Sequence, residues 1–324
     1  MRKRKIRIGS RDSVLAVKQA QLVIDVITRS HPGLNIELVT MKTTGDLNQN
    51  HFDEINRENK SSFGAKDLFI KELERALLNG QIDIAVHSLK DVPVSSMQQD
   101  APLPILAFSE RANPRDALVL PPGYNGEGGS IPISFLYNIG CSSARRRVQL
   151  KRLMPGCRVR PIRGNVLTRL KKLDEGIEKY SSLVLAAAGL IRLGLESRVY
   201  KLFSPDEMIP AAGQGTLAIQ GRRHRVPHKR SVDYGFLDSV NDPDSEDCAK
   251  CEMAFVERLG GGCTTPVAAF AEVHGTELGL IGLYVDETRE IYRKERLSGD
   301  RKDAVKLGET LAERLQQDGE IVGR

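Results

Sequence analysis

One carboxylate stands beside a cation where an apolar segment ends. The stretch VHSLKDVP places Lys90 and Asp91 shortly after the apolar residues 84–86, and Pro93 stops the segment. An aspartate in such a place commonly caps its own turn. Among many cations, however, a carboxylate stays ionised, because nearby positive charge favours its charged form. It could then stabilise a developing cation on a substrate or shuttle a proton, so Asp91 is a candidate catalytic residue.

Arginines recur where strands are expected to give way to helices. Guanidinium groups bind carboxylates and phosphates through paired hydrogen bonds, and helix N-termini add backbone N–H donors. A single arginine is usually a solvated surface charge. Six at equivalent places in two βα units favour a ligand that carries several carboxylates or phosphates. The six are Arg11, Arg145, Arg146, Arg163, Arg169 and Arg192.

A cysteine follows a run of glycines. The glycines at 260–262 strip side chains from the approach to Cys263. A thiol that reaches out on a flexible loop needs this, although a plain glycine turn is the alternative. Cys263 could also join Cys248, Cys251 and His274 as a zinc ligand, but the first pair lies in a helical pattern rather than on the tight turn of a zinc site. We therefore expect no metal site.

Composition narrows the class of protein. The 324 residues suffice for two or three domains, at roughly 100–200 residues each. The net charge of +6 can attract polyanions. With no Trp and only 5% aromatic residues, the chain poorly supplies the stacking platforms that bind single-stranded nucleic acid. Small polyanionic ligands fit better, and we predict no nucleic-acid partner.

The compartment follows from what the sequence lacks. Its longest apolar run, 183–191, is far shorter than the ~20 residues that span a bilayer. The basic start MRKRKIRIGS is not followed by an apolar stretch, so we expect no secretory signal. Five cysteines, an odd count, do not form a disulfide framework. These features predict a cytoplasmic protein in a reducing compartment, with no membrane partner.

Two stretches share one plan of alternating strands and helices. In the first, strands are expected at 5–8, 36–41 and 83–89, with helices at 13–28 and 67–78. The second repeats the plan, with strands at 138–140, 158–162 and 183–187 and helices at 143–153 and 166–173. Such alternation implies βαβ crossovers and a parallel sheet. We predict two similar α/β domains with a cleft between them, at the carboxyl ends of the strands.

The pattern changes after about residue 239. A helix at 245–259, three alternating strands at 267–273, 278–285 and 290–297, and a last amphipathic helix predict a small α+β domain. The segment IPAAGQGTLAIQ at 209–220 suits a hinge that returns the chain to the first sheet. The predicted domains are 1–109 with 214–237, then 110–213, then 238–324. The polar segment 43–66 is long enough to be a lid or a disordered loop.

The motifs together resemble one family. They are IGSRDSVLA, FGAKDLFIKELERALLNGQIDIAVHSLKDVP, ERANPRDALV, IGCSSARRRVQL, IRGNVLTRL, LAAAGLIRLGL, IPAAGQGTLAIQ and GGGCTTP. Their order and spacing are similar to those of the porphobilinogen deaminase, or hydroxymethylbilane synthase, family. The resemblance covers nearly the whole chain. Any one motif is weak evidence, whereas the ordered set is highly specific.

The resemblance implies a fold and a reaction. It implies three domains, the first two like those of periplasmic binding proteins, in a protein that is usually monomeric. A dipyrromethane cofactor would be bound as a thioether to Cys263 and would prime the joining of four porphobilinogen molecules, with loss of ammonia. Water would then release the linear tetrapyrrole hydroxymethylbilane. Every pyrrole carries an acetate and a propionate, which gives the arginines a role, and Asp91 would assist at the cationic centre left by ammonia.

The resemblance also assigns binding residues, motif by motif. Those expected to bind cofactor or substrate carboxylates are Arg11, Ser13, Lys66, Lys90, Ser143, Arg145, Arg146, Arg163, Arg169 and Arg192. One departure is Cys141, which stands where the family usually has a threonine and puts a hydroxyl contact there in doubt. A second lysine of the lid is not clearly placed, and Lys60 is a weak candidate.

Two other classes of protein remain open from the residues alone. A two-lobed solute-binding protein for an organic acid would explain the repeated α/β plan and the arginines, but not Asp91 or Cys263, and it would normally carry an export signal. A nucleic-acid binder rests on net charge alone. The intact mass discriminates among them, because a covalent cofactor predicts a mass excess that disappears in Cys263→Ser.

Overall fold

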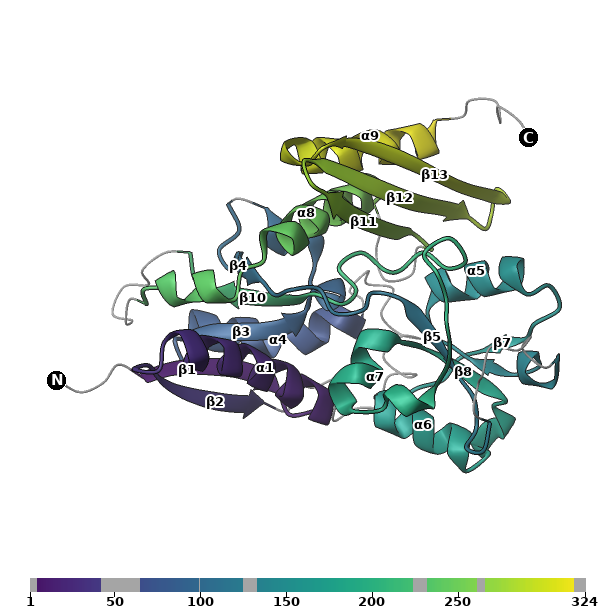
Figure 1. Ribbon diagram of the computed structural model, residues 1–324, viewed down its shortest axis with the longest axis horizontal. Coiled ribbons are helices and arrows are strands. Elements are labelled where there is room, and N and C mark those ends of the chain that lie inside the picture. The colour runs from purple at the N-terminus through teal and green to yellow at the C-terminus, as the bar shows by residue number, and fades with distance from the viewer. Residues whose placement is uncertain are drawn as a thin grey trace, which may run out of the picture.

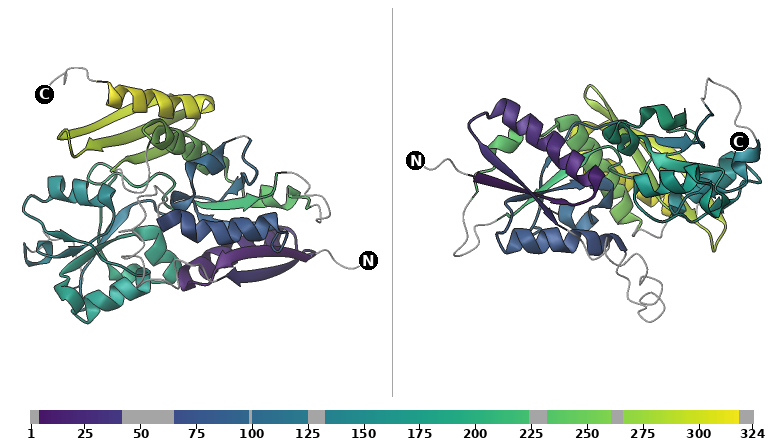
Figure 2. Two further views of the ribbon diagram at one scale, coloured as in Figure 1. Left: turned by 180° about the vertical axis from the view of Figure 1, so that it is seen from behind. Right: turned by 90° about the horizontal axis from the view of Figure 1, so that it is seen from below.

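The computed structural model describes residues 5–41, 65–98, 100–124, 133–223, 232–260 and 266–317. Three sheets organise this part of the chain (Figure 1). Two are mixed five-stranded sheets with helices packed on them, and the third is a three-stranded antiparallel sheet with two helices. The third sheet lies over both of the others, as the view from behind also shows (Figure 2).

The first α/β unit alternates strands and helices as predicted. Its elements are β1 (Lys5–Arg11), α1 (Val14–Ser30), β2 (Asn35–Met41), α4 (Ala65–Leu78), β3 (Ile84–Ser88), β4 (Ile105–Phe108) and, much later in the chain, β10 (Leu217–Gly221). The strand order is β2-β1-β3-β10-β4. β1 runs parallel to β2 and β3, whereas β10 runs antiparallel to β3 and β4.

Local sequence explains where α1 begins and how it packs. The Oγ of Ser13 accepts a hydrogen bond from the backbone N of Ala16 at 3.3 Å, which caps the helix. Ala20, Val23 and Ile27 recur at helical spacing and are buried in the core of this unit. The cap and this packing therefore fix the first turn of α1 at the carboxyl end of β1.

The second α/β unit repeats this architecture. Its elements are β5 (Asp116–Val119), β6 (Ile139–Gly140), α5 (Ala144–Leu153), β7 (Val159–Arg160), α6 (Val166–Asp174), β8 (Ser182–Ala186), α7 (Ala187–Leu193) and β9 (Val199–Leu202). The order β7-β6-β8-β5-β9 matches that of the first sheet strand for strand. β6 runs parallel to β7 and β8, and β5 runs antiparallel to β8 and β9.

The expectation of a parallel sheet holds for the βαβ strands but not for the whole of either sheet, because both sheets are mixed. Each sheet receives one strand that arrives from the other unit, β5 in the second and β10 in the first, and these strands run against their neighbours. β5 is only four residues long and buried throughout, so it has no alternating pattern that would reveal it in the sequence. The βαβ plan itself was predicted correctly.

Two segments, 109–115 and 203–216, carry the chain between the units and are called the crossing segments here. They meet where the backbone N of Ala112 donates to the carbonyl oxygen of Gly215 at 3.3 Å. Gly215 has φ of 101°, and a Cβ there would lie 2.3 Å from the carbonyl oxygen of Ala112. Only glycine permits so close an approach of the two backbones. The predicted hinge at 209–220 corresponds to this crossing and to the start of β10.

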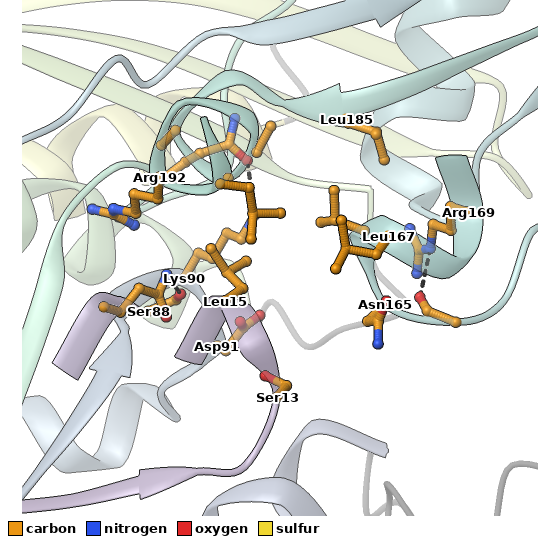
Figure 3. Close-up of a pocket in the computed structure, with 18 of the residues that line it drawn as sticks. Ser13, Leu15, Ser88, Lys90, Asp91, Asn165, Leu167, Arg169, Leu185 and Arg192 are labelled. Atoms are coloured by element: carbon orange, nitrogen blue, oxygen red, sulfur yellow. Dashed lines mark hydrogen bonds between the residues drawn. The ribbon is translucent and has the colours of Figure 1, made fainter. Parts of the chain in front are cut away.

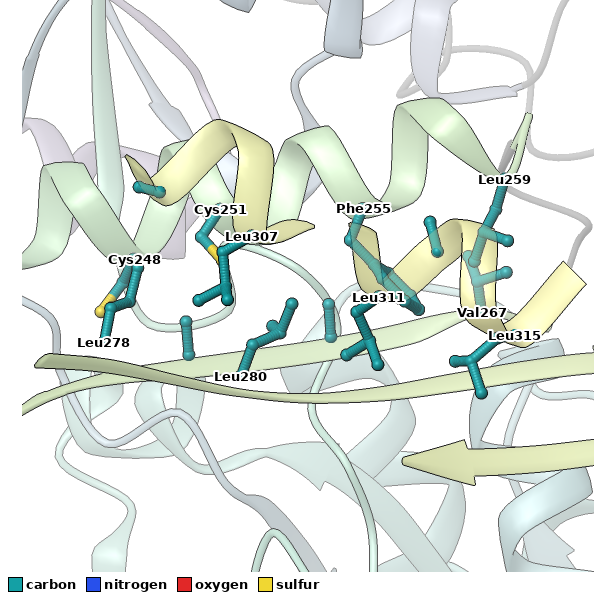
Figure 4. Packing of buried hydrophobic residues seen from close by; sticks show 14 residues of the cluster. Cys248, Cys251, Phe255, Leu259, Val267, Leu278, Leu280, Leu307, Leu311 and Leu315 are labelled. Carbon is teal, nitrogen blue, oxygen red and sulfur yellow. The ribbon is translucent and has the colours of Figure 1, made fainter. Parts of the chain in front are cut away.

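The third unit is the predicted α+β arrangement. It consists of α8 (Pro243–Arg258), β11 (Ala268–His274), β12 (Glu277–Asp286), β13 (Ile291–Asp300) and α9 (Ala304–Gln316). Figure 4 shows Phe255 of α8 and Leu311 of α9 packed over Leu280 of β12 in one apolar cluster. Short 3₁₀ helices complete the described chain: η1 (Leu89–Asp91), η2 (Val94–Met97), η3 (Ile133–Leu136), η4 (Ile177–Lys179), η5 (Glu196–Arg198), η6 (Gly235–Ser239) and η7 (Arg301–Asp303).

A buried ion pair ties the third unit to both crossing segments. Arg111 of the first crossing segment binds the fully buried Glu252 of α8 through two N–H groups, at 2.8 and 3.2 Å. The same carboxylate accepts from the backbone N of Gly213, in the second crossing segment, and of Ala271, in β11, each at 2.7 Å. Glu252 therefore has a full set of donors, as a buried charge requires.

Candidate active site

A cleft of about 690 Å³ lies between the two α/β units. Its walls come from the carboxyl ends of strands and the helix starts that follow them, together with α7 and the second crossing segment. Figure 3 shows Ser13, Lys90 and Asp91 on the side of the first unit and Asn165, Leu167 and Arg169 on the side of the second. The cleft is where the sequence predicted it.

The first unit presents the candidate acid on a short, well-anchored segment. Asp91 ends η1, which follows β3 directly. The backbone N of Leu89 donates to the carbonyl oxygen of Thr216 at 3.0 Å. The buried side chain of Leu89 packs on Gly213, so closely that a Cβ added at Gly213 would lie 2.5 Å from Cγ of Leu89. Lys90 and Asp91 therefore sit on backbone that the second crossing segment holds in place. Arg11 and Ser13 line the cleft from the β1–α1 turn.

The second unit contributes its cations from helix starts and from α7. Asn165 caps α6 by accepting from the backbone N of Thr168 at 2.9 Å, which places Arg163 just ahead of the helix. Arg169, one turn into α6, donates through Nε to the carbonyl oxygen of Gly164 at 2.8 Å. Arg192 lies near the end of the short α7 rather than at a strand-to-helix turn, and it still reaches the cleft.

Positive charge dominates this cleft. Among the described residues that line it, the cations are Arg11, Lys90, Arg146, Arg163, Arg169 and Arg192, and the carboxylate is Asp91. Burial lowers the pKa of Arg192 to about 10, so it remains a cation at neutral pH. Burial, and then repulsion from Arg146, also lowers the pKa of Arg169. Since burying a charge is unfavourable unless it is paired, anionic ligands are strongly favoured here.

Behind the cleft, two neighbouring arginines share one buried carboxylate. Arg145 binds Oδ2 of Asp116 at 2.6 Å, and Arg146 binds Oδ1 at 2.7 Å through one N–H and 2.9 Å through another. Burial alone would raise the pKa of Asp116, but attraction by Arg145 and Arg146 outweighs it and holds that pKa well below its usual range. The cluster is a fixed part of the second unit at neutral pH.

Two predicted binding residues do not lie on the wall of the cleft. Arg145 points into the Asp116 cluster and also donates to the carbonyl oxygen of Ile209 at 2.6 Å. Ser143 caps α5, where its Oγ accepts from the backbone N of Arg146 at 3.4 Å. Arg146 differs from both because it reaches the cleft as well as Asp116. Direct contact of Ser143 and Arg145 with a ligand stays a prediction.

Some predicted residues fall outside the described part of the chain. Cys263 and Lys60 are among them, as is most of the 43–66 segment. Lys66 lies in the first turn of α4, and its side chain is outside what the structure describes. Their assignments stay predictions.

The structure adds lining residues that the sequence did not reveal. The polar ones are Gln19, Ser88, Ser142, Asn165, Gln214 and Thr216, and the larger apolar ones are Val14, Leu15, Ile162, Val166, Leu167, Leu185 and Leu193. The apolar group gives the cleft a surface on which flat rings can pack. Gln214 lies in the GQG stretch that indicated only a hinge, and the leucines look like ordinary core positions in the sequence.

Other titratable residues have structural roles. His87 is buried, and its Nε2 lies 3.1 Å from Oε1 of Gln220, so it is a hydrogen-bonded core residue. Cys248 and Cys251 lie inside α8 in the apolar cluster of the third unit, where burial raises the pKa of both thiols, that of Cys248 to about 12. No group of three potential metal ligands occurs among the described residues. Cys141 is buried beside the cleft, not on its wall.

Comparisons with known proteins identify the family. The protein-family model described as "Porphobilinogen deaminase, dipyromethane cofactor binding domain" matches residues 6–229. A second family model, "Porphobilinogen deaminase, C-terminal domain", matches residues 247–317. The porphobilinogen deaminase of Acetivibrio thermocellus is 49% identical over 95% of this chain and 97% of its own. That of Ruminiclostridium josui is 45% identical over 98% of this chain and 100% of its own.

Solved structures give weaker similarity. The BenM effector-binding domain with benzoate has a TM-score of 0.40 and 16% identity, and covers 73% of this chain and 90% of its own. The periplasmic aliphatic sulphonate binding protein SsuA from Escherichia coli has a TM-score of 0.39 and 13% identity, and covers 78% of this chain and 70% of its own. The fold class is therefore established by the strand orders described above, which confirm two similar α/β units and a small α+β unit.

The fold, the cation-lined cleft and the matched families define a dipyrromethane-dependent enzyme of tetrapyrrole biosynthesis. The chain belongs to the porphobilinogen deaminase family. The predicted family, reaction class and cofactor are confirmed, and the solute-binding and nucleic-acid-binding alternatives are set aside. In the described part of the chain, no helix combines the length and apolar character needed to cross a membrane.

Proposed function

We propose that Asp91 is the catalytic carboxylate and that the cleft cations hold the carboxylates of cofactor and substrate. One observation carries the proposal: a single carboxylate faces six cations among the described residues of the cleft. The family's cofactor carries acetate and propionate groups on its rings. These groups fit the cations, and the rings fit the apolar wall formed by residues such as Leu15, Leu167 and Leu185.

The cofactor, when bound through Cys263, supplies the primer to which porphobilinogen is added. Arg169 and Arg192 make no ion pair with a carboxylate in the described part of the chain, so a ligand carboxylate can bind each of them in the paired geometry that arginine favours. Binding at several arginines orients the reacting carbon and reduces the entropy cost of joining two rings.

Asp91 acts at the centre that becomes positive as ammonia leaves. The surrounding cations keep it ionised, so it can accept a hydrogen bond from a ring N–H and lower the energy of a nearby cation. It can also take or return a proton at its carboxylate oxygen. Its fixed position in η1 means that little reorganisation is needed during the reaction.

The experiment compares Asp91→Asn with Asp25→Asn, a change at an exposed residue of α1. Removing the charge at Asp91 should lower tetrapyrrole formation from porphobilinogen by at least ~100-fold, the range of a general acid–base contribution. The Asp25 variant should match the parent, and both variants should unfold near the parent's melting temperature. Turnover within a few-fold of the parent in Asp91→Asn would refute the assignment.

We also propose Cys263 as the attachment point of the cofactor. Support comes from the three glycines before it and from the match of GGGCTTP to the family pattern. The intact mass of purified protein should exceed the mass of the bare chain, and Cys263→Ser should remove the excess. Cys157→Ser is the control, since Cys157 is a half-buried thiol of the second unit that does not line the cleft.

Three domains account for the organisation of the chain. We propose that 1–109 with 214–237 forms the first, 110–213 the second and 238–324 the third, supported by the three separate sheets. We also propose that the protein is a monomer and that it is cytoplasmic. The four cysteines of the described chain are all free thiols, as expected in a reducing compartment.

A further inference from the structure

Gln214 stands where the chain returns from the second unit to the first. It is 1% exposed and yet contributes to the wall of the cleft. Its backbone is fixed on both sides: its N donates to the carbonyl oxygen of Ala211 at 2.9 Å, and its carbonyl oxygen accepts from Nε of Arg111 at 3.0 Å. The side chain therefore leaves the backbone at a defined point.

The side-chain amide of Gln214 bridges the two units. Its Oε1 accepts from Nζ of Lys90, in the first unit, at 3.3 Å. Its Nε2 donates to Oδ1 of Asp116, in the second unit, at 2.9 Å and to the carbonyl oxygen of Pro114 at 2.7 Å. The orientation of the amide is unambiguous, because the ammonium group needs an acceptor and both oxygens need a donor.

This bridge joins two cations of the cleft. Lys90 precedes the proposed catalytic Asp91, and Oδ1 of Asp116 also binds Arg146. The chain of contacts runs from Lys90 through Gln214 and Asp116 to Arg146, and both ends line the cleft. An amide of this length donates at one end and accepts at the other, whereas methionine cannot donate and accepts only weakly, and glutamate accepts but does not donate.

We propose that Gln214 is a positioning residue that sets the separation of the Lys90 ammonium and the Arg146 guanidinium across the cleft. The inference rests on the proposed function, in which both cations bind ligand carboxylates. Gln214 acts through these two neighbours, so the two halves of the cleft keep a spacing that matches a ligand with several carboxylates.

The test uses full-length protein with Gln214→Met, Gln214→Glu and the control Gln149→Met. Gln149 is a matched control because it is 3% exposed, and its amide bonds the backbone of Ile209 and Arg145 without touching Lys90. Three quantities are measured: kcat and KM for porphobilinogen, the melting temperature, and the rate at which acetyl N-hydroxysuccinimide modifies Lys90. Mass spectrometry reads the modification, with the exposed Lys302 as internal reference.

Gln214→Met should lower kcat/KM by roughly 10- to 100-fold, because buried partners lose their hydrogen bonds. Lys90 should be acetylated severalfold faster than in the parent, since its ammonium has lost an acceptor. Gln214→Glu should keep Lys90 as protected as in the parent, yet lose at least as much kcat/KM, because a second carboxylate then faces Asp116. Gln149→Met should lose stability while keeping the parent's KM and Lys90 reactivity.

Several results would overturn the proposal: kcat/KM within about twofold of the parent in Gln214→Met or in Gln214→Glu, unchanged Lys90 reactivity in Gln214→Met, or an equal loss of kcat/KM in the control. Failure here is distinct from failure of the proposed function. An inactive Asp91→Asn together with a fully active Gln214→Met would leave the catalytic assignment intact and remove only the positioning role.

Discussion

The guanidinium group of Arg192 donates to the carbonyl oxygen of Gly215 at 2.5 Å. This contact joins a cation of the second unit to the backbone of a crossing segment, at the same oxygen that accepts from Ala112. A carboxylate in the cleft would compete with Gly215 for Arg192. Ligand binding and the geometry of the crossing are therefore connected through one side chain.

Replacing Arg192 should weaken ligand binding more than it weakens the fold. Arg192→Leu removes a cation whose contacts in the described chain include no carboxylate, so KM for porphobilinogen should rise at least tenfold, the equivalent of about 1.4 kcal/mol. Steady-state kinetics measure this. Arg198→Leu, which breaks the ion pair with Asp174 away from the cleft, should leave KM unchanged; an equal rise in both variants would contradict the assignment.

Replacing each of the two arginines that bind Asp116 should have different effects on protein stability and on ligand binding. Arg145→Leu removes one buried partner and should reduce the free energy of unfolding by roughly 3 kcal/mol, while Asp116 keeps Arg146. Because Arg145 lies behind the wall of the cleft, KM should rise less in Arg145→Leu than in Arg146→Leu. Arg146→Leu should raise KM as well, because Arg146 also lines the cleft. Urea unfolding and steady-state kinetics test the pair, and a larger rise in KM for Arg145→Leu would reverse our reading.

Acid should destabilise the first unit through His87. Burial lowers the pKa of His87 from 6.5 to about 4, so the unfolded chain binds a proton between these values while the folded chain does not. Stability is therefore lost as the pH falls from 6.5 towards 4. At pH 5 the loss should be about 2 kcal/mol relative to pH 7. In His87→Gln this contribution should vanish. Urea unfolding of variant and parent at pH 5 and pH 7 measures it. An equal loss of unfolding free energy in both proteins would contradict the role of His87.

The two units also approach each other at α1 and α7. A Cβ at Gly189 would lie 3.8 Å from Leu15 of α1 and 3.9 Å from Val166 of α6, at the wall of the cleft. Alanine fits there in ordinary contact, whereas leucine would force the helices apart. Gly189→Ala should keep turnover within about twofold of the parent, and Gly189→Leu should lower kcat/KM by ~10-fold or more through a widened cleft. Equal activity in both variants would show that this contact does not set the cleft.

Sequence reasoning was strongest where a local signal and a periodic pattern coincide. The apolar spacing of residues 13–28 predicted α1 to within two residues at each end, and in the structure Ser13 supplies the local signal by capping the helix. The carboxyl ends of β1 and β3 then predicted the place of Arg11 and Asp91 in the cleft. In both cases residues close together in the chain determine the outcome.

What the sequence could not give depends on partners far apart in the chain. Aspartate is usually a surface residue, so the sequence does not mark Asp116 as buried. Only the fold brings Arg145, Arg146 and Gln214 around it. Arg145 and Arg146 are adjacent, so no motif reveals which one faces the cleft. Strand β5 was missed because it is four residues long and buried throughout, and its partners in β8 lie more than sixty residues away in the chain.

The carboxylate of Glu252 has a consequence for anyone who would shorten this protein. A fragment that contains only the two α/β units would leave the Arg111 guanidinium without the Glu252 carboxylate and the backbone N–H of Gly213 without an acceptor. The smallest piece expected to behave as a well-formed catalyst therefore includes α8, and truncation there should yield a poorly expressed, protease-sensitive product rather than a minimal enzyme.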